Sequence, residues 1–249
     1  MKIAIVGCGK IADAHVEEIR KIPSVQLVAV CDLEPIMAEQ LATRYVIPRW
    51  YCDVKRMLDM EKPDVLHIPT PPQSHLLLAQ QAVAAGCHVF LEKPVAPCHC
   101  DAEATDPGQP LDELRVLIRG AHTSAHATFS AHARPIGHAL RVYGTKNTAY
   151  VDFVTRTVVL ECQQTFPSAL GRLAPPFLVA NDYLRQGLRN LNSFSHSRFG
   201  YFDGMRRLLT KFYLSIGRDL PPPIPYNEIL RVSGMMERIF EQVYPEVYA

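Results

Sequence analysis

The stretch Lys2-Ile-Ala-Ile-Val-Gly-Cys-Gly-Lys-Ile-Ala12 is a short apolar run that leads directly into the pattern Gly7-x-Gly9-x-x-Ala12. The run predicts a buried strand, and the residues after it predict an amphipathic helix. Gly7 permits a tight turn, Gly9 lets the backbone approach a pyrophosphate, and the small Ala12 lets the helix pack on the strand. The helix N-terminus offers N–H groups to the phosphates. The stretch therefore predicts a dinucleotide-binding turn.

An acidic residue follows at the position that such a site requires. Residues 25–31 form a second apolar run, and Asp32 closes it, 20 residues beyond Ala12. A carboxylate at this spacing binds the hydroxyls of the adenosine ribose. The glycine pattern alone is weak, because glycine turns after strands are common. The order of strand, turn, helix, strand and acid favours a nucleotide site over a simple turn.

The composition excludes several classes of partner. The chain has 249 residues, of which 48% are hydrophobic and 20% charged, with a net charge of +1. It can bury a sizeable core in one or two domains, and its charge indicates neither nucleic acid nor an anionic membrane as a partner. No apolar run reaches the roughly 18 residues of a membrane-spanning helix. The chain is expected to enter a strand at residue 2, without the basic and apolar regions that are typical of a signal peptide.

The seven cysteines lie mostly within apolar segments. An odd number in such positions suits a reducing cytoplasm better than a disulfide framework, so we expect a cytoplasmic protein. The tripeptide Cys98-His99-Cys100 offers three metal donors within three residues, but no second pair follows at zinc-site spacing. We therefore predict no metal site.

The first hundred residues alternate apolar strands with helical segments, which predicts a parallel sheet with crossover helices. The predicted strands cover residues 2–6, 25–31, 64–68 and 88–91, and the predicted helices cover residues 11–21, 35–45, 53–60 and 74–85.

Two motifs follow strands of this sheet at their carboxyl ends, where open α/β sheets bind ligands. Thr70-Pro71-Pro72-Gln73-Ser74-His75 follows the third predicted strand, and Glu92-Lys93-Pro94 follows the fourth. Pro94 favours an extended backbone at Lys93, so that the ammonium projects from the strand end. Each motif by itself also fits an ordinary loop. Together, at corresponding strand ends, they favour a binding site.

The combination of Gly7-Cys-Gly-Lys-Ile-Ala12, Cys31-Asp32, the Thr70–His75 motif and Glu92-Lys-Pro94 resembles the Gfo/Idh/MocA oxidoreductases, the group of glucose–fructose oxidoreductase and inositol dehydrogenase. The resemblance covers residues 1–97. It implies a Rossmann-type domain and hydride transfer between NAD(P) and a sugar, cyclitol or related polyol or carbonyl compound. It also implies a set of cofactor-binding residues: Gly7, Gly9, Lys10, Ile11, Asp32, Thr70, Pro71, His75, Glu92 and Lys93.

The resemblance gives catalytic roles to Lys93 and Glu92. Lys93 would contact the reacting oxygen, where it polarises a carbonyl or accepts a hydroxyl proton, and Glu92 would orient it. The residues after Asp32 are Leu33 and Glu34 rather than a basic residue. NAD is favoured over NADP, because a 2′-phosphate would meet carboxylates there.

Residues 95–113 depart from the family pattern. They form a polar segment with proline and glycine, where the family has further strands and a helix that carries an acid/base histidine. No counterpart of that histidine is found before residue 114. Three interpretations remain open: an oxidoreductase that works without this histidine, a nucleotide-binding pseudoenzyme or interaction protein, and a longer family member that has lost an internal block.

The second half predicts an α+β domain. Strands without helices between them indicate a mainly antiparallel sheet, and they are expected at residues 114–118, 122–132, 140–144, 148–153 and 156–162. His122, His126 and His132 would share one strand face, which we interpret as solvent-facing or subunit-facing rather than metal-binding.

Helical spacing of apolar residues follows at residues 202–216 and 229–243. The predicted organisation is therefore a nucleotide-binding domain at residues 1–97, a linker at 98–113, and a substrate and oligomerisation domain at 114–249. In the family that this chain resembles, the second sheet commonly makes the subunit contact, so we expect a homo-oligomer.

Overall fold

A computed structural model describes the chain at residues 1–93, 113–130, 132–162, 170–196, 200 and 202–243. The chain divides into two compact units, which are residues 1–110 with 204–249 and residues 111–203. Most of the predicted linker, including the Cys98-His99-Cys100 tripeptide, lies outside the described residues.

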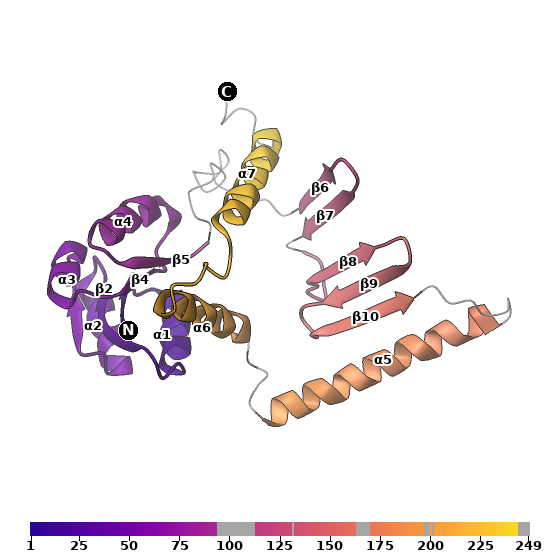
Figure 1. Ribbon diagram of the computed structural model, residues 1–249, viewed down its shortest axis with the longest axis horizontal. Coiled ribbons are helices and arrows are strands. Elements are labelled where there is room, and N and C mark those ends of the chain that lie inside the picture. Colours follow the sequence, from indigo (N-terminus) through magenta and orange to yellow (C-terminus); the bar gives the residue numbers. More distant parts are fainter. Residues whose placement is uncertain (94–112, 131, 163–169, 197–199, 201, 244–249) are drawn as a thin grey trace. The chain divides into compact units, whose positions relative to one another are not determined.

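The first unit contains one parallel sheet. Its five strands are Lys2–Val6 (β1), Gln26–Cys31 (β2), Arg49–Tyr51 (β3), Val65–Ile68 (β4) and His88–Leu91 (β5). They lie in the order β3-β2-β1-β4-β5, and all neighbours run parallel (Figure 1). The strand order reverses beside β1, because β2 and β4 lie on opposite sides of it. The predicted Rossmann-type sheet is confirmed, and its switch point is where such sheets bind ligands.

Strand β3 differs from the sequence prediction, which has no strand between residues 45 and 53. It is three residues long, and its Arg49 and Trp50 are exposed. It therefore has neither the apolar run nor the alternation by which a strand is identified in a sequence. Pairing with β2 holds it in the sheet instead.

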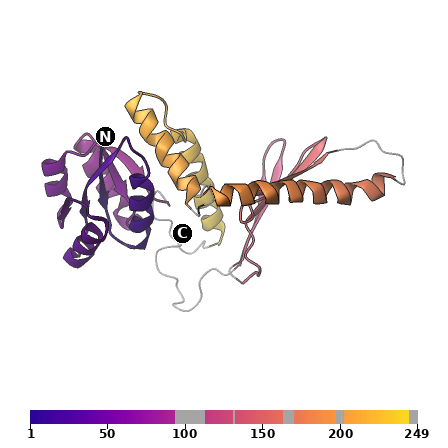
Figure 2. The same ribbon diagram turned by 90° about the horizontal axis from the view of Figure 1, so that it is seen from below.

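Helices cover both faces of the parallel sheet (Figures 1 and 2). Apolar residues of α1 (Lys10–Arg20), α2 (Pro35–Tyr45) and α6 (Asp203–Gly217) form a core with Ile3 and Ile5 on one face. On the other face, α3 (Val54–Glu61) and α4 (Pro72–Ala84) contribute to a core with Ala4 and Val6. The strands read as continuous apolar runs because both of their faces are buried.

Helices α6 and α7 (Tyr226–Val243) belong to the first unit, whereas the sequence analysis assigns residues 114–249 to a second domain. Leu209 of α6 is fully buried, and Tyr213 is nearly so, in the same core as β1 and α1. The apolar stripe predicted that α6 has a buried face. It contained no information about which sheet that face covers.

Gly7 is a position where the backbone requires glycine. Its φ is +98°, and a Cβ there would lie 2.6 Å from Thr70 Cγ2 and 3.2 Å from the Pro69 carbonyl oxygen. We expect Gly7→Ala to lower the free energy of unfolding by about 2–4 kcal/mol, from backbone strain and overpacking together. Urea unfolding followed by circular dichroism measures this. Combining it with Thr70→Ser, which removes the clashing methyl, should recover part of the loss; equal stability of Gly7→Ala and wild type would contradict the prediction.

The second unit is built from antiparallel strands, as predicted. Glu113–Arg119 (β6) and Ser124–Ser130 (β7) form a hairpin. A three-stranded sheet in the order β10-β9-β8 follows, made of Ala139–Tyr143 (β8), Asn147–Asp152 (β9) and Thr157–Cys162 (β10).

Helix α5 (Leu170–Ser195) lies along β10 (Figure 1). The side-chain amide of Gln186 accepts from the Val158 N–H at 2.5 Å and donates to the Val158 carbonyl at 2.6 Å. It therefore satisfies edge-strand groups that would otherwise be open to pairing with another chain.

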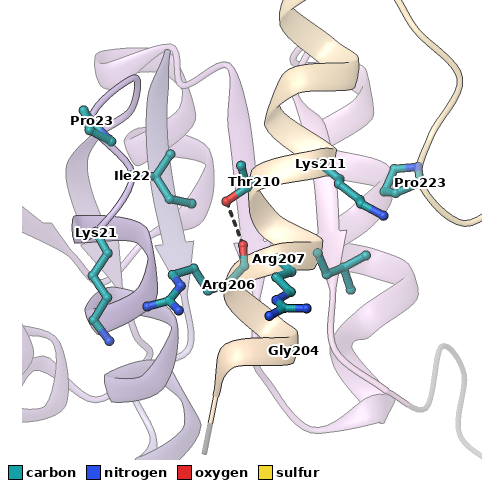
Figure 3. A pocket seen from close by; sticks show the side chains of 10 residues that line it. Lys21, Ile22, Pro23, Gly204, Arg206, Arg207, Thr210, Lys211 and Pro223 are labelled. Carbon is teal, nitrogen blue, oxygen red and sulfur yellow. Dashed lines mark hydrogen bonds between the residues drawn. The ribbon is translucent and has the colours of Figure 1, made fainter. Parts of the chain in front are cut away.

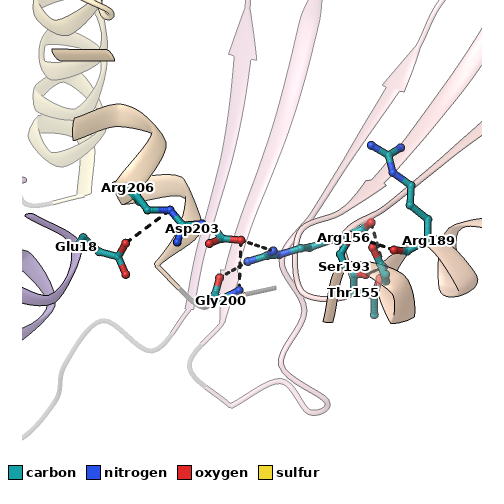
Figure 4. A network of polar contacts seen from close by, with 9 residues as sticks. Glu18, Thr155, Arg156, Arg189, Ser193, Gly200, Asp203 and Arg206 are labelled. Atoms are coloured by element: carbon teal, nitrogen blue, oxygen red, sulfur yellow. Dashed lines mark hydrogen bonds and ion pairs between the residues drawn. The ribbon is translucent and has the colours of Figure 1, made fainter. Parts of the chain in front are cut away.

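Gly200 and Asp203 are joined to the turn between β9 and β10 by a small polar network (Figure 4). The Arg156 guanidinium donates to the Gly200 carbonyl and pairs with Asp203 at 3.3 Å. The Gly200 N–H donates to the same carboxylate at 3.3 Å. Arg156 and Asp203 are partly or largely buried, so this ion pair is better shielded from water than a surface pair.

Candidate dinucleotide site

A cavity of about 700 Å³ opens at the carboxyl ends of β1, β2 and β4. It lies beside the switch point of the sheet, where the fold predicts a ligand. Half of the ten predicted cofactor-binding residues line it, namely Gly7, Gly9, Asp32, Thr70 and Pro71. The predicted residues that do not line it are Lys10, Ile11, His75, Glu92 and Lys93.

The β1–α1 turn presents open backbone to this cavity. The Gly7 N–H donates to the Cys31 carbonyl at 2.8 Å, which ties the turn to β2. Gly9 is the N-cap of α1 and makes no side-chain cap. A Cβ built on Gly9 would meet no atom within 4 Å, and its φ of −75° is ordinary. Packing of the chain therefore does not require glycine here, and the free space fits a phosphate group against the helix N-terminus.

The Asp32 carboxylate is held by two backbone amides at the end of β2. Its Oδ2 accepts from the Cys8 N–H at 2.7 Å, and its Oδ1 accepts from the Glu34 N–H at 3.0 Å. Each carboxylate oxygen has a further lone pair, so the group can still accept hydrogen bonds from ribose hydroxyls. Lys55 of α3, a basic residue outside the predicted motifs, also lines the cavity.

The loop after β4 is fixed from within by His75. This side chain is fully buried, and its Nε2 lies 2.8 Å from the Thr70 carbonyl oxygen, to which it donates. The Ser74 hydroxyl donates to Thr70 Oγ1 at 2.8 Å. His75 thus holds the loop that carries Thr70 and Pro71, while those two residues line the cavity.

Glu92 and Lys93 follow β5 at the same edge of the sheet. Lys93 is exposed, and its backbone N–H donates to Glu92 Oε2 at 3.3 Å. The other carboxylate oxygen, Oε1, lies 2.9 Å from Nε2 of the buried His15 on α1. Glu92 is therefore anchored on both of its oxygens beside Lys93.

Sequence reasoning missed three buried polar residues behind Glu92. His15 Nδ1 lies 2.9 Å from His67 Nδ1, and His67 Nε2 lies 2.8 Å from the Tyr213 hydroxyl. His15 on the apolar face of α1 and His67 within an apolar strand were visible signals. The contacts among them and with Glu92 could not be predicted, because the four residues come from α1, from β4, from the position after β5 and from α6.

The environment keeps these groups in defined protonation states. Burial, with a smaller effect of His15, holds the pKa of His67 well below its usual value near 6.5. The hydrogen bond from His15 lowers the pKa of Glu92, although partial burial opposes it. Burial raises the pKa of Tyr213. At neutral pH His67 is neutral, Glu92 is ionised and Tyr213 keeps its proton.

A second cavity, of about 680 Å³, is lined by basic residues of α6 together with Lys21, Ile22 and Pro23 (Figure 3). Those three residues connect α1 to the amino end of β2, so this cavity lies at the opposite edge of the sheet. Glu18 already pairs with Lys21 at 2.6 Å and lies 3.9 Å from Arg206 (Figure 4). No predicted site residue lines this cavity.

The described part of the chain gives little support for a cysteine nucleophile, a metal site or a membrane-spanning helix. Burial raises the pKa of the Cys8 and Cys31 thiols to about 12, so neither is a thiolate nucleophile at neutral pH. Among the described residues, no group of three or more histidine, cysteine or acidic side chains could hold a metal ion. Across the described helices, none has both the length and the apolar character needed to cross a bilayer.

Comparison with known proteins agrees with the geometry of this site. The model of the Gfo/Idh/MocA family, described as an oxidoreductase family with an NAD-binding Rossmann fold, matches residues 1–106. D-glucoside 3-dehydrogenase of Escherichia coli K12 is 37% identical over 97 residues, which are 39% of this chain and 28% of that protein. Inositol 2-dehydrogenase of Salmonella paratyphi B is 30% identical over 122 residues, which are 48% of this chain and 36% of that protein.

The chain thus spans about a third of the length of these two relatives. Among solved structures, UDP-N-acetylglucosamine 3-dehydrogenase GnnA of Acidithiobacillus ferrooxidans has a TM-score of 0.52 at 18% identity. The match covers 72% of this chain and 87% of that one, and it shows likeness of fold alone. Residues 1–106 are similar in sequence to the Gfo/Idh/MocA oxidoreductase family, which is described as having an NAD-binding Rossmann fold.

Proposed function

We propose that this chain binds NAD(H) in the 700 Å³ cavity and catalyses hydride transfer to or from a sugar, cyclitol or related polyol or carbonyl compound. The observation that carries the proposal is the turn at Gly9, the N-cap of α1. A Cβ at Gly9 would meet no atom within 4 Å, so the space beside the helix N-terminus is open to a phosphate group. Asp32 at the end of the next strand supplies the ribose-binding carboxylate. The names of the relatives support the substrate class, since they include a glucoside and an inositol dehydrogenase.

Among the two nicotinamide cofactors we propose NAD. Asp32 and Glu34 carry negative charge where the 2′-phosphate of NADP would come, and this disfavours the phosphate. Lys55 lines the same cavity and acts in the opposite sense. The two carboxylates stand on the loop that directly follows β2, so we expect their effect to dominate.

Lys93 is the proposed catalytic residue. The cofactor, when bound, supplies or accepts the hydride. In the oxidation direction, the Lys93 amine in its unprotonated form accepts the proton of the substrate hydroxyl, while the hydride leaves the carbon and a carbonyl forms. In reduction, the charged ammonium polarises the carbonyl and returns the proton. Glu92, fixed by His15 and by the Lys93 backbone, orients this side chain.

A titration of the purified chain with NADH and NADPH, followed by fluorescence and calorimetry, tests the proposal. We expect saturable NADH binding that is roughly tenfold or more tighter than NADPH binding, a difference of about 1.4 kcal/mol. With NAD and a panel of sugars and cyclitols, NADH should form in the presence of at least one member. Absence of heat and of fluorescence change with both cofactors would overturn the proposal.

We also propose that the chain forms a homo-oligomer through its second unit. Cross-strand pairing gives the three-stranded sheet one apolar face. On this face, the two outer strands β8 and β10 carry four residues that are each about half exposed, namely Leu140, Val142, Val158 and Leu160. The opposite face carries Val159, which is buried. An apolar face of this kind favours a partner surface over water.

Val142→Lys should therefore convert an oligomer into a monomer, because a desolvated ammonium opposes burial of this face. Tyr143→Lys is the matched control, since Tyr143 is exposed on the other face of the same strand. Size-exclusion chromatography with light scattering measures the mass of each protein. A monomeric wild type, or an oligomer that tolerates Val142→Lys, would be evidence against this interface.

We also propose that the protein is located in the reducing cytoplasm. It rests on the cysteines, of which there are seven in the chain. The five in the described residues, Cys8, Cys31, Cys52, Cys87 and Cys162, are all free thiols. Such thiols are typical of compartments that keep cysteine reduced.

A further inference from the structure

Four side chains form a continuous hydrogen-bonded relay inside the first unit. It runs from Glu92 Oε1 to His15 Nε2 at 2.9 Å, from His15 Nδ1 to His67 Nδ1 at 2.9 Å, and from His67 Nε2 to the Tyr213 hydroxyl at 2.8 Å. Both histidines are completely buried, and Tyr213 is 3% exposed. Only the Glu92 end reaches water, with 19% of its side chain exposed. The relay is therefore closed to water at Tyr213 and open to water at Glu92, next to Lys93 in the chain.

Matching each donor with an acceptor assigns the positions of the protons along this relay. A neutral histidine carries one N–H and one acceptor nitrogen. A donating Tyr213 hydroxyl makes His67 Nε2 the acceptor and leaves the His67 proton on Nδ1. That proton faces His15 Nδ1, which must then accept, so the His15 proton lies on Nε2 and is donated to Glu92. Every buried polar atom in the relay is satisfied in this arrangement.

The reverse arrangement leaves a buried donor without a partner. If His67 donated from Nε2 to Tyr213, His15 Nδ1 would have to carry a proton. With Glu92 ionised, His15 would then be an imidazolium, and the Tyr213 proton would face none of the relay atoms. An unmade hydrogen bond in the interior is costly, and so is a buried charge next to a neutral histidine.

The surroundings of the relay are apolar. The ring of Phe90 stacks on His67 with centroids 4.8 Å apart, and it meets His15 edge-on at 5.8 Å. Phe212 packs against Phe90 at 5.5 Å. A core of this kind could be filled with apolar side chains at little loss of stability, so the ordered polar groups point to a role beyond packing.

We propose that Tyr213 and His67 are positioning residues, which fix the tautomer of His15 so that its Nε2–H permanently faces the Glu92 carboxylate. Glu92 Oε1 is thereby occupied, and Oε2 is left beside Lys93, whose backbone N–H it accepts. The relay holds the carboxylate in one orientation next to the Lys93 ammonium. Its value for catalysis rests on the proposed function, but the proton arrangement does not.

Histidine-selective ¹⁵N labelling of the full chain tests the assignment directly. Long-range ¹H–¹⁵N correlation spectra distinguish the two neutral tautomers from each other and from the imidazolium. At neutral pH we expect His15 as the Nε2–H form and His67 as the Nδ1–H form, with His15→Gln and His67→Gln used to assign the signals. A charged His15, or the opposite tautomer at either residue, would overturn the proposal. If one variant fails to fold, the signal lost in the other variant assigns that histidine, and the tautomer of this one residue is enough to test the proposal.

Tyr213→Phe then tests whether the phenol sets the tautomers. We expect His67 and His15 to become mixtures of tautomers, because His67 Nε2 loses its donor. Tyr45→Phe is the matched control, since its hydroxyl bonds Glu17 at the surface at 3.3 Å and does not belong to the relay. Unchanged tautomers in Tyr213→Phe would refute the positioning role.

The catalytic consequence is measured separately. If the chain turns over a polyol, Tyr213→Phe should lower kcat roughly three- to tenfold, which corresponds to the loss of one hydrogen bond, with little change in the affinity for NADH. An unchanged kcat with altered tautomers would remove the catalytic part of the proposal. If no polyol is turned over, the proposed function fails, while the tautomer spectra still test the relay.

Discussion

Gly9→Asp should weaken NADH binding by at least about 100-fold, or about 2.7 kcal/mol, without destabilising the fold. Gly9 is the N-cap of α1, and aspartate is among the favoured residues at that position because its side chain accepts from the N–H groups of the first turn. A Cβ at Gly9 meets no atom within 4 Å, so the new side chain fits. The same N–H groups are the proposed ligands of the pyrophosphate, and they would then face a fixed negative charge.

Gly9→Asp should weaken NADH binding while it leaves stability unchanged or higher, so a loss of affinity cannot be attributed to unfolding. We expect the free energy of unfolding to stay equal or to rise by a few tenths of a kcal/mol, which urea titration measures. Gly137→Asp is the control: it adds the same carboxylate in the second unit, where a Cβ also meets no atom within 4 Å. It should leave NADH affinity unchanged. Wild-type affinity in Gly9→Asp would show that the dinucleotide does not bind at this turn.

The nucleotide-binding half of the fold was predictable because its signals are local. Gly7, Gly9, Ala12 and Asp32 lie within two consecutive strand–helix steps. The first three are tied to requirements of the backbone and of helix packing, and Asp32 is tied to the ribose hydroxyls. The structure adds a direct reason for Gly7, namely its positive φ and the proximity of Thr70. Such requirements can be read from spacing alone.

Other features depend on contacts between distant segments, and the sequence contains no local sign of them. The three-residue strand β3 exists because β2 offers it a pairing edge. The apolar stripe of α6 predicts a buried face, but only the structure shows that Leu209 and Tyr213 pack on the parallel sheet. The relay behind Glu92 likewise joins residues 77, 52 and 146 positions apart. Each of its histidines, taken alone, resembles an ordinary core residue.

Lys93→Met should lower kcat for polyol oxidation by roughly 10²- to 10⁴-fold, the usual contribution of a general acid or base. Methionine retains an unbranched side chain of similar length but cannot accept or donate a proton. Lys93 is exposed and makes no contribution to the cavity that holds Gly9 and Asp32. NADH affinity should therefore change by less than about threefold, and the free energy of unfolding should stay within about 0.5 kcal/mol of wild type.

The separation of rate from affinity identifies the role of Lys93. Lys146→Met, an exposed lysine in the turn between β8 and β9, removes the same charge and should leave both quantities unchanged. A residue that acts only through the cofactor would change NADH affinity together with rate, whereas a proton-transfer group changes rate alone. A Lys93→Met protein with the kcat of wild type would exclude Lys93 as the acid or base. In that case Glu92, whose carboxylate is ionised and fixed by His15 at the same strand end, would be the next residue to test by Glu92→Gln.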